Sequence, residues 1–152
     1  MASAKNLRTW IELDKKALEH NVKQFLKLIP KGARFMAVIK SNAYGHGLVQ
    51  VASQLAALNP KPYNLNPRLW FGVDSIVEAL RLREEGIKNP ILVLGSTLPG
   101  RLKEAAENNI ILTVSNFESL EALRKTKNRP AFHIKIDTGM HRQGFLPKDI
   151  FK

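Results

Sequence analysis

Apolar residues along the chain gather into short unbroken runs, and these runs alternate with longer stretches of helical periodicity. The unbroken runs cover residues 35–39, 69–73, 91–94 and 110–114. A strand that is covered on both faces has such a run, whereas a half-exposed strand alternates apolar and polar residues. We therefore expect four buried strands, and a fifth strand at residues 131–137, where the pattern alternates. A shorter alternating segment at residues 9–14 predicts one more strand at the start of the chain.

The stretches between the runs carry apolar residues three or four positions apart, which is typical of helices with one buried face. We expect helices at residues 15–29 and 48–58, between Ser75 and Gly86, at about residues 101–108, and after Asn116. Asp14 is placed to cap the first of these helices, and Ser75 with Glu78 fits a capping box. The Pro- and Asn-rich residues 59–67 cannot continue a helix and predict a surface loop.

This order of elements predicts an α/β fold built around a parallel sheet. The last four units repeat at about 20 residues, enough for a strand, a short helix and two turns. A doubly wound sheet and a (β/α)₈ barrel both fit this pattern. A barrel normally takes about 250 residues. Five strand–helix units in 152 residues therefore predict, if the fold is a barrel, one that is truncated after about five units.

Composition narrows the chemistry that the chain can use. Hydrophobic residues make up 44% of the chain, which is enough for a folded domain with a core. The absence of cysteine excludes disulfides, thiolate nucleophiles and zinc–cysteine sites, and it is compatible with the cytoplasm. The first residues lack the apolar segment of a signal peptide, and no apolar run approaches membrane-spanning length. We therefore expect a cytoplasmic protein without membrane association.

The chain is strongly basic, with a formal net charge of +11 and a sequence pI near 10.1. Nucleic-acid binding must therefore be considered. The lysines and arginines are scattered over expected helices and loops, and no block of five or six like charges occurs. We favour a solvated basic surface over a nucleic-acid-binding one, with attraction to anionic ligands as the alternative.

Lys40 interrupts the first apolar run at its carboxyl end, and a small-residue turn with Gly45 and Gly47 follows it. Solubility alone is a poor explanation for a lysine at the end of a buried strand, because surface strands alternate apolar and polar residues and this strand does not. Desolvation beside an apolar strand makes a lysine amine a better nucleophile toward carbonyls. Lys40 is therefore the first candidate for a chemical role, and the two glycines are expected to serve the geometry of the turn.

The expected strand at residues 131–137 has two faces of different character, because alternate residues of a strand share a face. One face holds Phe132, Ile134 and Ile136, and the other holds His133, Lys135 and Asp137. In a barrel, the apolar face would meet the helices and the polar face would point inward, where barrel chemistry lies. An edge strand with its polar face in water is the alternative.

Lys135 inside a barrel would need a compensating anion or a lowered pKa. Asp137 is one candidate, because it lies two residues further along the same face. Carbamylation of Lys135 is another, because it turns the amine into an anion that could pair with Arg142.

The sequences around these two lysines resemble motifs of one known family. Residues 37–47, Ala-Val-Ile-Lys-Ser-Asn-Ala-Tyr-Gly-His-Gly, resemble the lysine motif of alanine racemases, which are fold-type III pyridoxal-phosphate enzymes. Residues 133–142, His-Ile-Lys-Ile-Asp-Thr-Gly-Met-His-Arg, resemble the substrate-side motif of that family. Further similar segments are residues 9–14, 71–73, 78–87 and 90–95. The resemblance covers essentially the whole chain.

The resemblance implies an amino-terminal (β/α)₈ barrel followed by a β-rich domain, in an enzyme that works as a homodimer. Residues 1–14 would be an amino-terminal strand that packs on the β-rich domain, and residues 15–152 would be a partial barrel that binds pyridoxal 5′-phosphate. The implied reaction interconverts L-alanine and D-alanine, so the substrate is a small amino acid. It supplies D-alanine for cell-wall peptidoglycan.

The resemblance also implies roles for four residues. Lys40 would hold pyridoxal phosphate as a Schiff base and act as one of two opposed acid/base groups. Tyr44 matches a tyrosine that contacts the cofactor phosphate. Arg142 matches an arginine that steadies the phenolic oxygen of the cofactor and the substrate region. Lys135 matches a lysine that is often carbamylated and orients that arginine.

The family continues past the residues matched here with three more barrel units and the β-rich domain. Those parts hold the phosphate-binding loops, an arginine that faces the pyridine nitrogen, and a catalytic tyrosine donated by the partner subunit. We therefore expect the 152-residue chain alone to be inactive or poorly folded.

Three alternatives to an alanine racemase stay open. A racemase of the same fold with another or broader amino-acid specificity would share all the motifs found here. A non-catalytic remnant could keep pyridoxal-phosphate binding alone. A basic domain that binds polyanions would explain the charge but not the motifs.

Overall fold

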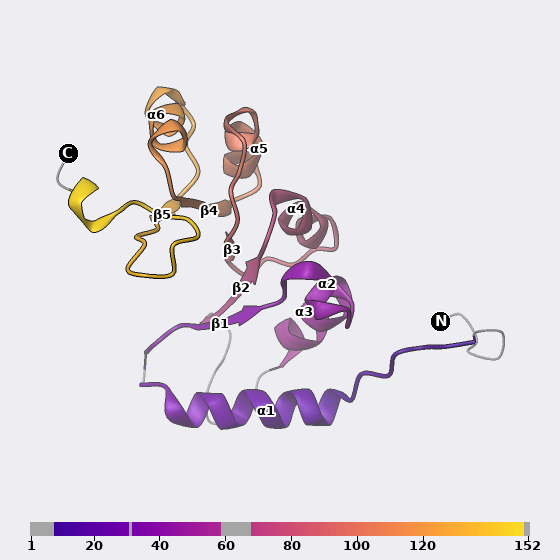
Figure 1. Ribbon diagram of the computed structural model, residues 1–152. Coiled ribbons are helices and arrows are strands. Elements are labelled where there is room, and N and C mark those ends of the chain that lie inside the picture. Colours follow the sequence, from indigo (N-terminus) through magenta and orange to yellow (C-terminus); the bar gives the residue numbers. More distant parts are fainter. Residues whose placement is uncertain (1–7, 31, 59–67, 151–152) are drawn as a thin grey trace.

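Five parallel strands form one sheet in the computed structural model, which describes residues 8–30, 32–58 and 68–150 (Figure 1). The strands are β1 Phe35–Val38, β2 Leu69–Val73, β3 Ile91–Val93, β4 Ile110–Val114 and β5 Phe132–Ile134. Their order in the sheet is their order in the sequence, and each neighbouring pair is parallel. A doubly wound sheet reverses its strand order at a switch point, so this order is that of a barrel.

Helices connect the strands and lie along the outer side of the curved sheet (Figure 1). They are α1 Lys15–Leu28, α2 Lys40–Tyr44, α3 Leu48–Ala57, α4 Ile76–Glu84, α5 Leu102–Glu107 and α6 Phe117–Lys125. All the expected helices are present, and short 3-10 turns add Pro99–Arg101 and Pro147–Asp149. The prediction of an α/β fold with a barrel truncated after about five units is thus confirmed.

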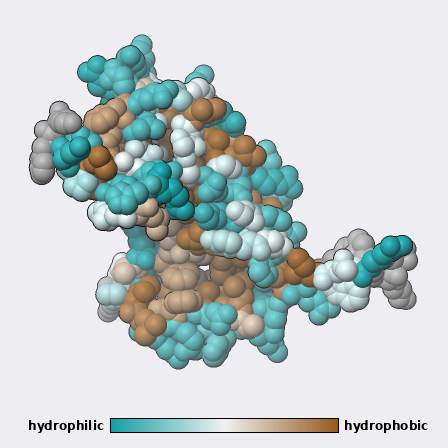
Figure 2. Space-filling view, in the orientation of Figure 1, coloured by the Kyte–Doolittle hydropathy of each residue, from teal (hydrophilic) through white to brown (hydrophobic). Residues whose placement is uncertain are grey.

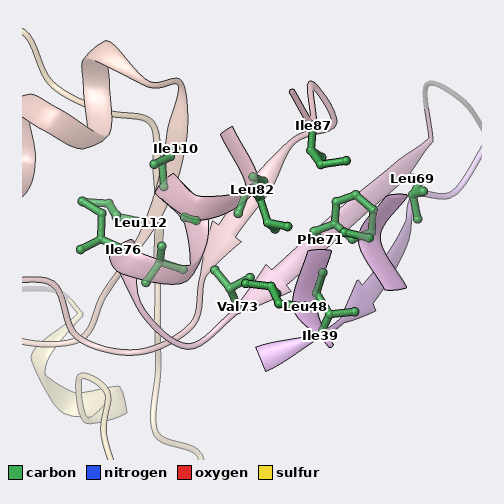
Figure 3. Close-up of a cluster of buried hydrophobic side chains, with 14 of the residues drawn as sticks. Ile39, Leu48, Leu69, Phe71, Val73, Ile76, Leu82, Ile87, Ile110 and Leu112 are labelled. Atoms are coloured by element: carbon green, nitrogen blue, oxygen red, sulfur yellow. The ribbon is translucent and has the colours of Figure 1, made fainter. Parts of the chain in front are cut away.

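The core lies between the outer face of the sheet and the helices (Figure 3). Alternate strand residues point to this face and have at most 2% of their surface exposed: Leu69, Phe71, Val73, Ile91, Val93, Ile110, Leu112 and Val114. The helices add Ala52, Ala79, Leu82 and Ala105, which are fully buried. Side chains of β2, β3 and β4 therefore share one apolar layer, and the packing of this layer fixes where the ends of these strands lie.

Helix α1 packs against this unit through one apolar stripe, in which Val22 and Leu26 are buried. Figure 2 shows hydrophilic atoms along the outer rim of α1 and hydrophobic atoms between α1 and the sheet. Asp14 caps the helix as expected, since its carboxylate accepts hydrogen bonds from the backbone N–H of Lys16 (2.7 Å) and Ala17 (3.1 Å). No helix in the described residues is long and apolar enough to cross a membrane.

The inner face of the sheet curves enough to bring β2 and β5 within contact distance. Two strands separate them in the sheet, yet the rings of Trp70 and His133 lie 6.2 Å apart between centroids. The guanidinium of Arg34 stacks over Trp70 at 4.7 Å from the ring centroid. The inner face therefore closes toward a lumen, as the walls of a barrel do.

One expectation about strands needs correction, and another stays a prediction. Residues 9–14 pair with no described strand, but the strand expected there would pack on a β-rich domain, so that expectation is not tested. The strand expected at residues 131–137 is shorter, and past Ile134 only a single bridge joins Ile136 to Phe145. The loop expected at residues 59–67 lies outside the described residues.

The faces of β5 also differ from the barrel expectation. Phe132, Ile134 and Ile136 are 39%, 57% and 42% exposed, so this apolar face is only partly covered, and Phe132 alone of the three lines a cavity with residues of α6. β5 is an edge strand of the described sheet, which is one part of the alternative interpretation; its other part placed the polar face in water. Lys135 on the polar face is nevertheless only partly exposed and lines a cavity on the inner side.

Arg83 joins the turns before β3 and β4 by hydrogen bonds. Its guanidinium donates to the backbone carbonyls of Ile87 (2.7 Å), Asn89 (2.9 Å), Asn108 (2.9 Å) and Asn109 (2.9 Å). Partial burial lowers the pKa of Arg83, and the planar fork of donors still keeps it paired. The turns before β3 and β4 are therefore joined through a single side chain of α4.

Replacing Arg83 by methionine should lower the free energy of unfolding by about 2 kcal/mol, because several carbonyls lose a charged donor while the apolar stem is kept. Urea unfolding monitored by tryptophan fluorescence measures this loss. Arg81→Met is the matched control, since Arg81 is an exposed arginine of the same helix whose ion pairs within the described residues are with Glu84 and Glu85. Its effect should stay under about 1 kcal/mol. Equal losses in the two variants would contradict the joining role of Arg83.

Candidate active site

The chain after Lys40 turns in the left-handed sense for four residues. Ser41, Asn42, Ala43 and Tyr44 have φ values of 53°, 55°, 52° and 54°, so α2 is a left-handed helical turn without a glycine. Such a conformation costs about 1–2 kcal/mol per residue for L-amino acids. Strain of this kind persists only where the surroundings hold it, and it clusters at functional sites.

Hydrogen bonds from both sides hold this turn in place. The carbonyl oxygen of Asn42 accepts from the N–H of Gly47 (2.9 Å), and its side-chain oxygen accepts from the N–H of Leu48 (2.8 Å). The N–H of Asn42 donates to the Glu78 carboxylate (3.1 Å). Gly45 and Gly47 have φ values of 92° and 95°, which confirms that they serve the turn geometry. Three hydrogen bonds thus compensate for the strained backbone beside Lys40.

Lys40 lies in a polar cavity of about 470 Å³ at the carboxyl ends of the strands. The lining residues are Lys40, Asp74, Leu94, Gly95, Ser96, Lys135, Arg142 and Gln143. They follow β1, β2, β3 and β5, so the parallel register brings together residues that are about a hundred positions apart. The carboxyl ends of barrel strands are where barrel enzymes bind their ligands.

The cavity carries more positive than negative charge. The amine of Lys40 lies 3.6 Å from the carboxylate of Asp74, and each side chain is partly exposed. Lys135 and Arg142 line the same cavity and have no ion-pair partner among the described residues. Three cationic side chains around one carboxylate suit an anionic ligand.

Asp137 does not neutralise Lys135, contrary to one of the two expectations for that lysine. The Asp137 carboxylate instead accepts the N–H groups of Gly139 (3.0 Å) and His141 (3.0 Å) within its own turn. These two bonds hold the pKa of the Asp137 carboxyl below its usual range. The carboxylate therefore shapes the loop that carries Arg142 rather than compensating the lysine charge.

Tyr44 lies apart from the other three candidate residues. Its side chain is 60% exposed and borders a second cavity of about 250 Å³ between α1, β1 and α3. That cavity is mainly apolar, with Leu13, Leu18 and Val51 in its lining. The structure thus brings Lys40, Lys135 and Arg142 together but does not place Tyr44 in their cavity.

Sequence reasoning missed five of the eight residues that line the Lys40 cavity, among them Asp74, Gly95 and Gln143. Asp74 directly follows β2, and the rule that ligands gather at carboxyl ends of parallel strands could have singled it out. Gly95 approaches the carbonyl oxygen of Asp74 so closely that an added Cβ would lie 2.4 Å from it. Gln143 donates its side-chain N–H to the carbonyl of Leu94 (3.2 Å), and no local signal marks that contact.

The chain is similar to known proteins over almost its whole length. It is 38% identical over 146 residues to an alanine racemase of Fusobacterium nucleatum, a match that spans 96% of this chain and 39% of that protein. The structure superposes on alanine racemase from Clostridium difficile 630 with a TM-score of 0.80 at 31% identity, covering 94% of this chain and 36% of that one. A histidine racemase from Leuconostoc mesenteroides gives a TM-score of 0.78 at 35% identity, with 96% and 38% covered.

Fold and cavity together define a parallel (β/α)-barrel module with its ionisable side chains gathered at the carboxyl ends of the strands. Residues 13–152 match the family model described as alanine racemase, N-terminal domain. The chain belongs to that family, and it spans less than two-fifths of the length of the relatives named above.

Gly95→Ala should displace Asp74, because the new methyl group would lie 2.4 Å from the carbonyl oxygen of that residue. We expect a loss of about 1–3 kcal/mol in the free energy of unfolding, measured by urea denaturation. Gly100→Ala is the control, since nothing lies within 4 Å of its added Cβ. A neutral Gly95 variant would show that the two backbones are not held together.

Asp137→Asn should lower stability near pH 7 and lose this effect in acid. The carboxyl pKa is depressed in the folded state, so its contribution is present above the unfolded-state pKa of about 3.9 and is lost as pH falls through the folded-state value. Unfolding of both proteins between pH 3 and pH 7 tests this, because the amide oxygen still accepts the two N–H groups without the charge. Glu118→Gln, an exposed carboxylate on α6, is the control. A gap between wild type and Asp137→Asn that is constant with pH would contradict it.

Proposed function

We propose that the chain is the lysine-bearing barrel part of a pyridoxal-phosphate-dependent amino-acid racemase that interconverts L-alanine and D-alanine. One observation carries the proposal. Lys40 projects from a strained turn into the same polar cavity as Arg142 and Lys135, within residues that match the family model.

The donor set of this cavity fits pyridoxal phosphate. The cofactor is an aldehyde with a phenolic oxygen and a phosphate, so it needs an amine together with cationic or hydrogen-bonding groups. Lys40 supplies the amine, and Arg142 supplies a fork of donors for an anionic oxygen. When bound, the cofactor supplies an electron sink that stabilises the charge left on the α-carbon.

The side chains of the chain then have separate tasks. The Lys40 amine would accept the α-proton on one face of the substrate, and the second, opposed acid/base group of the complete enzyme would supply a proton on the other face. Asp74 holds that amine from the side of β2. Arg142 orients the phenolic oxygen and the substrate region, and Lys135, if carbamylated, pairs with Arg142 as an anion.

Tyr44 is proposed to contact the cofactor phosphate from outside the Lys40 cavity. Its exposure leaves the hydroxyl group accessible to a ligand, and the left-handed turn links its position to that of Lys40. Residues 1–14 are proposed to pack on a β-rich domain of the complete enzyme, which acts as a homodimer in the cytoplasm and supplies D-alanine for peptidoglycan.

A racemase for another amino acid is the second candidate. The relative from Leuconostoc mesenteroides is named a histidine racemase, and its TM-score of 0.78 at 35% identity is close to the 0.80 at 31% identity of the alanine racemase from Clostridium difficile 630. The barrel part therefore supports amino-acid racemisation more strongly than it supports alanine as the substrate. Incubation of the enzyme with L-alanine and L-histidine, followed by chiral chromatography, separates the two.

Lys40→Arg should abolish covalent attachment of pyridoxal phosphate to the folded chain. The wild-type protein should form an absorbance band with the cofactor, and borohydride should convert it to a stable adduct on Lys40 that peptide mass spectrometry locates. Lys103→Arg is the control, because Lys103 is an exposed lysine of α5 remote from the cavity. Adducts spread over many lysines in the wild type, or salt-sensitive DNA retention without any adduct, would contradict the proposal in favour of a polyanion-binding domain.

A further inference from the structure

The carboxylate of Glu78 joins the two segments that flank the Lys40 amine. One oxygen accepts the N–H of Asn42 (3.1 Å) in the left-handed turn, and the other accepts the N–H of Asp74 (2.8 Å) at the end of β2. Asp74 in turn contacts the Lys40 amine at 3.6 Å. A single side chain of α4 thus holds both the backbone that carries the lysine and the residue that pairs with its amine.

The local sequence explains how Glu78 reaches this position. Ser75 caps α4 by accepting the N–H of Glu78 (3.3 Å), which is half of the expected capping box. The other half differs, because Glu78 bonds to the N–H of Asp74, one residue before the cap. This shift turns its second oxygen toward Asn42, 36 residues away in the sequence.

Capping alone does not account for the bond to Asn42. An N-terminal cap satisfies N–H groups of its own helix, whereas Asn42 belongs to the unit of β1. In the left-handed turn, the Asn42 N–H has no backbone acceptor among the described residues, so Glu78 is its partner. A carboxylate is also the side chain best suited to accept two separate N–H groups, because both of its oxygens are acceptors.

We propose that Glu78 is a positioning residue for the Lys40 amine, acting through Asn42 and Asp74. The proposal rests on the function assigned above, in which Lys40 binds pyridoxal phosphate. Glu78 fixes the strained turn on one side and the partner carboxylate on the other, so the amine points into the cavity with a defined geometry. A preorganised amine reacts faster with an aldehyde than a mobile one.

Glu78→Gln tests the proposal with the least change in shape. The amide has one acceptor oxygen in place of two, so it can keep only one of the two N–H groups. The full chain is incubated with pyridoxal phosphate and borohydride. The lysine amine and the aldehyde lose water to form a C=N bond, and hydride then reduces this bond to a secondary amine. Mass spectrometry of peptides gives the ratio of labelled Lys40 to labelled Lys103 within each molecule, and this ratio does not respond to uniform loosening.

The Lys40-to-Lys103 ratio should fall about three- to tenfold in Glu78→Gln, the equivalent of one lost hydrogen bond. Glu84→Gln is the matched control, because Glu84 is an exposed carboxylate of the same helix whose ion-pair partner in the described part of the chain is Arg81. It should leave the ratio unchanged. Hydrogen exchange adds a second readout, in which the Asn42 amide should be protected in the wild type and should exchange faster in Glu78→Gln.

Failure of the positioning role differs visibly from failure of the proposed function. Preferential labelling of Lys40 in the wild type with an unchanged ratio in Glu78→Gln would overturn the positioning role alone. Absence of preferential labelling in the wild type would overturn the proposed function and the inference with it. An unprotected Asn42 amide in the wild-type protein would also overturn the positioning role, even if the variant failed to fold.

Discussion

Four successive left-handed residues after Lys40 are the constraint on which the site depends. A lone barrel unit could not keep this turn, because its backbone is strained by several kcal/mol in total. Its partners come from outside the turn: the N–H groups of Gly47 and Leu48 on the carboxyl side, and Glu78 of the next unit. The geometry of the lysine is therefore a property of two adjoining units and not of its own strand.

The parallel arrangement of the strands places other polar side chains beside the Lys40 turn, and together they form a cavity. Because β1 to β5 run in the same direction, their carboxyl ends meet at one rim, where Asp74, Lys135 and Arg142 join Lys40. The opposite ends carry structural contacts, among them the hydrogen bonds from Arg83 to four backbone carbonyls. The ionisable cavity residues thus lie at the carboxyl ends of the strands, and the Arg83 contacts that stabilise the fold lie at the amino-terminal ends, as is usual in barrels.

The sequence pattern predicted strands and helices well wherever a segment is buried on its own account. Continuous apolar runs located β1 to β4, and the capping role of Asp14 was readable from its position. At residues 9–14 the alternation indicates strand propensity, but a strand also needs a neighbouring strand, which the described residues do not supply. The chain pattern also singled out Lys40 and Lys135. It could not reveal that Glu78 bonds to Asn42 or that Gly95 lies against Asp74, since these contacts arise from tertiary packing. For the same reason it could not show that Tyr44 lies outside the Lys40 cavity.

Strand order in the sheet follows chain order, and this has a consequence for how the molecule assembles. After the first pair, each strand finds its neighbour about twenty residues back, as Ile91 does with Phe71 and Ile110 does with Ile91. Loop-closure entropy grows only slowly with such separations, and mainly local contacts favour fast folding. The sheet can therefore grow one unit at a time as the chain leaves the ribosome. On that path, the turn that holds Lys40 gains its carboxylate partner only after residue 78 has emerged.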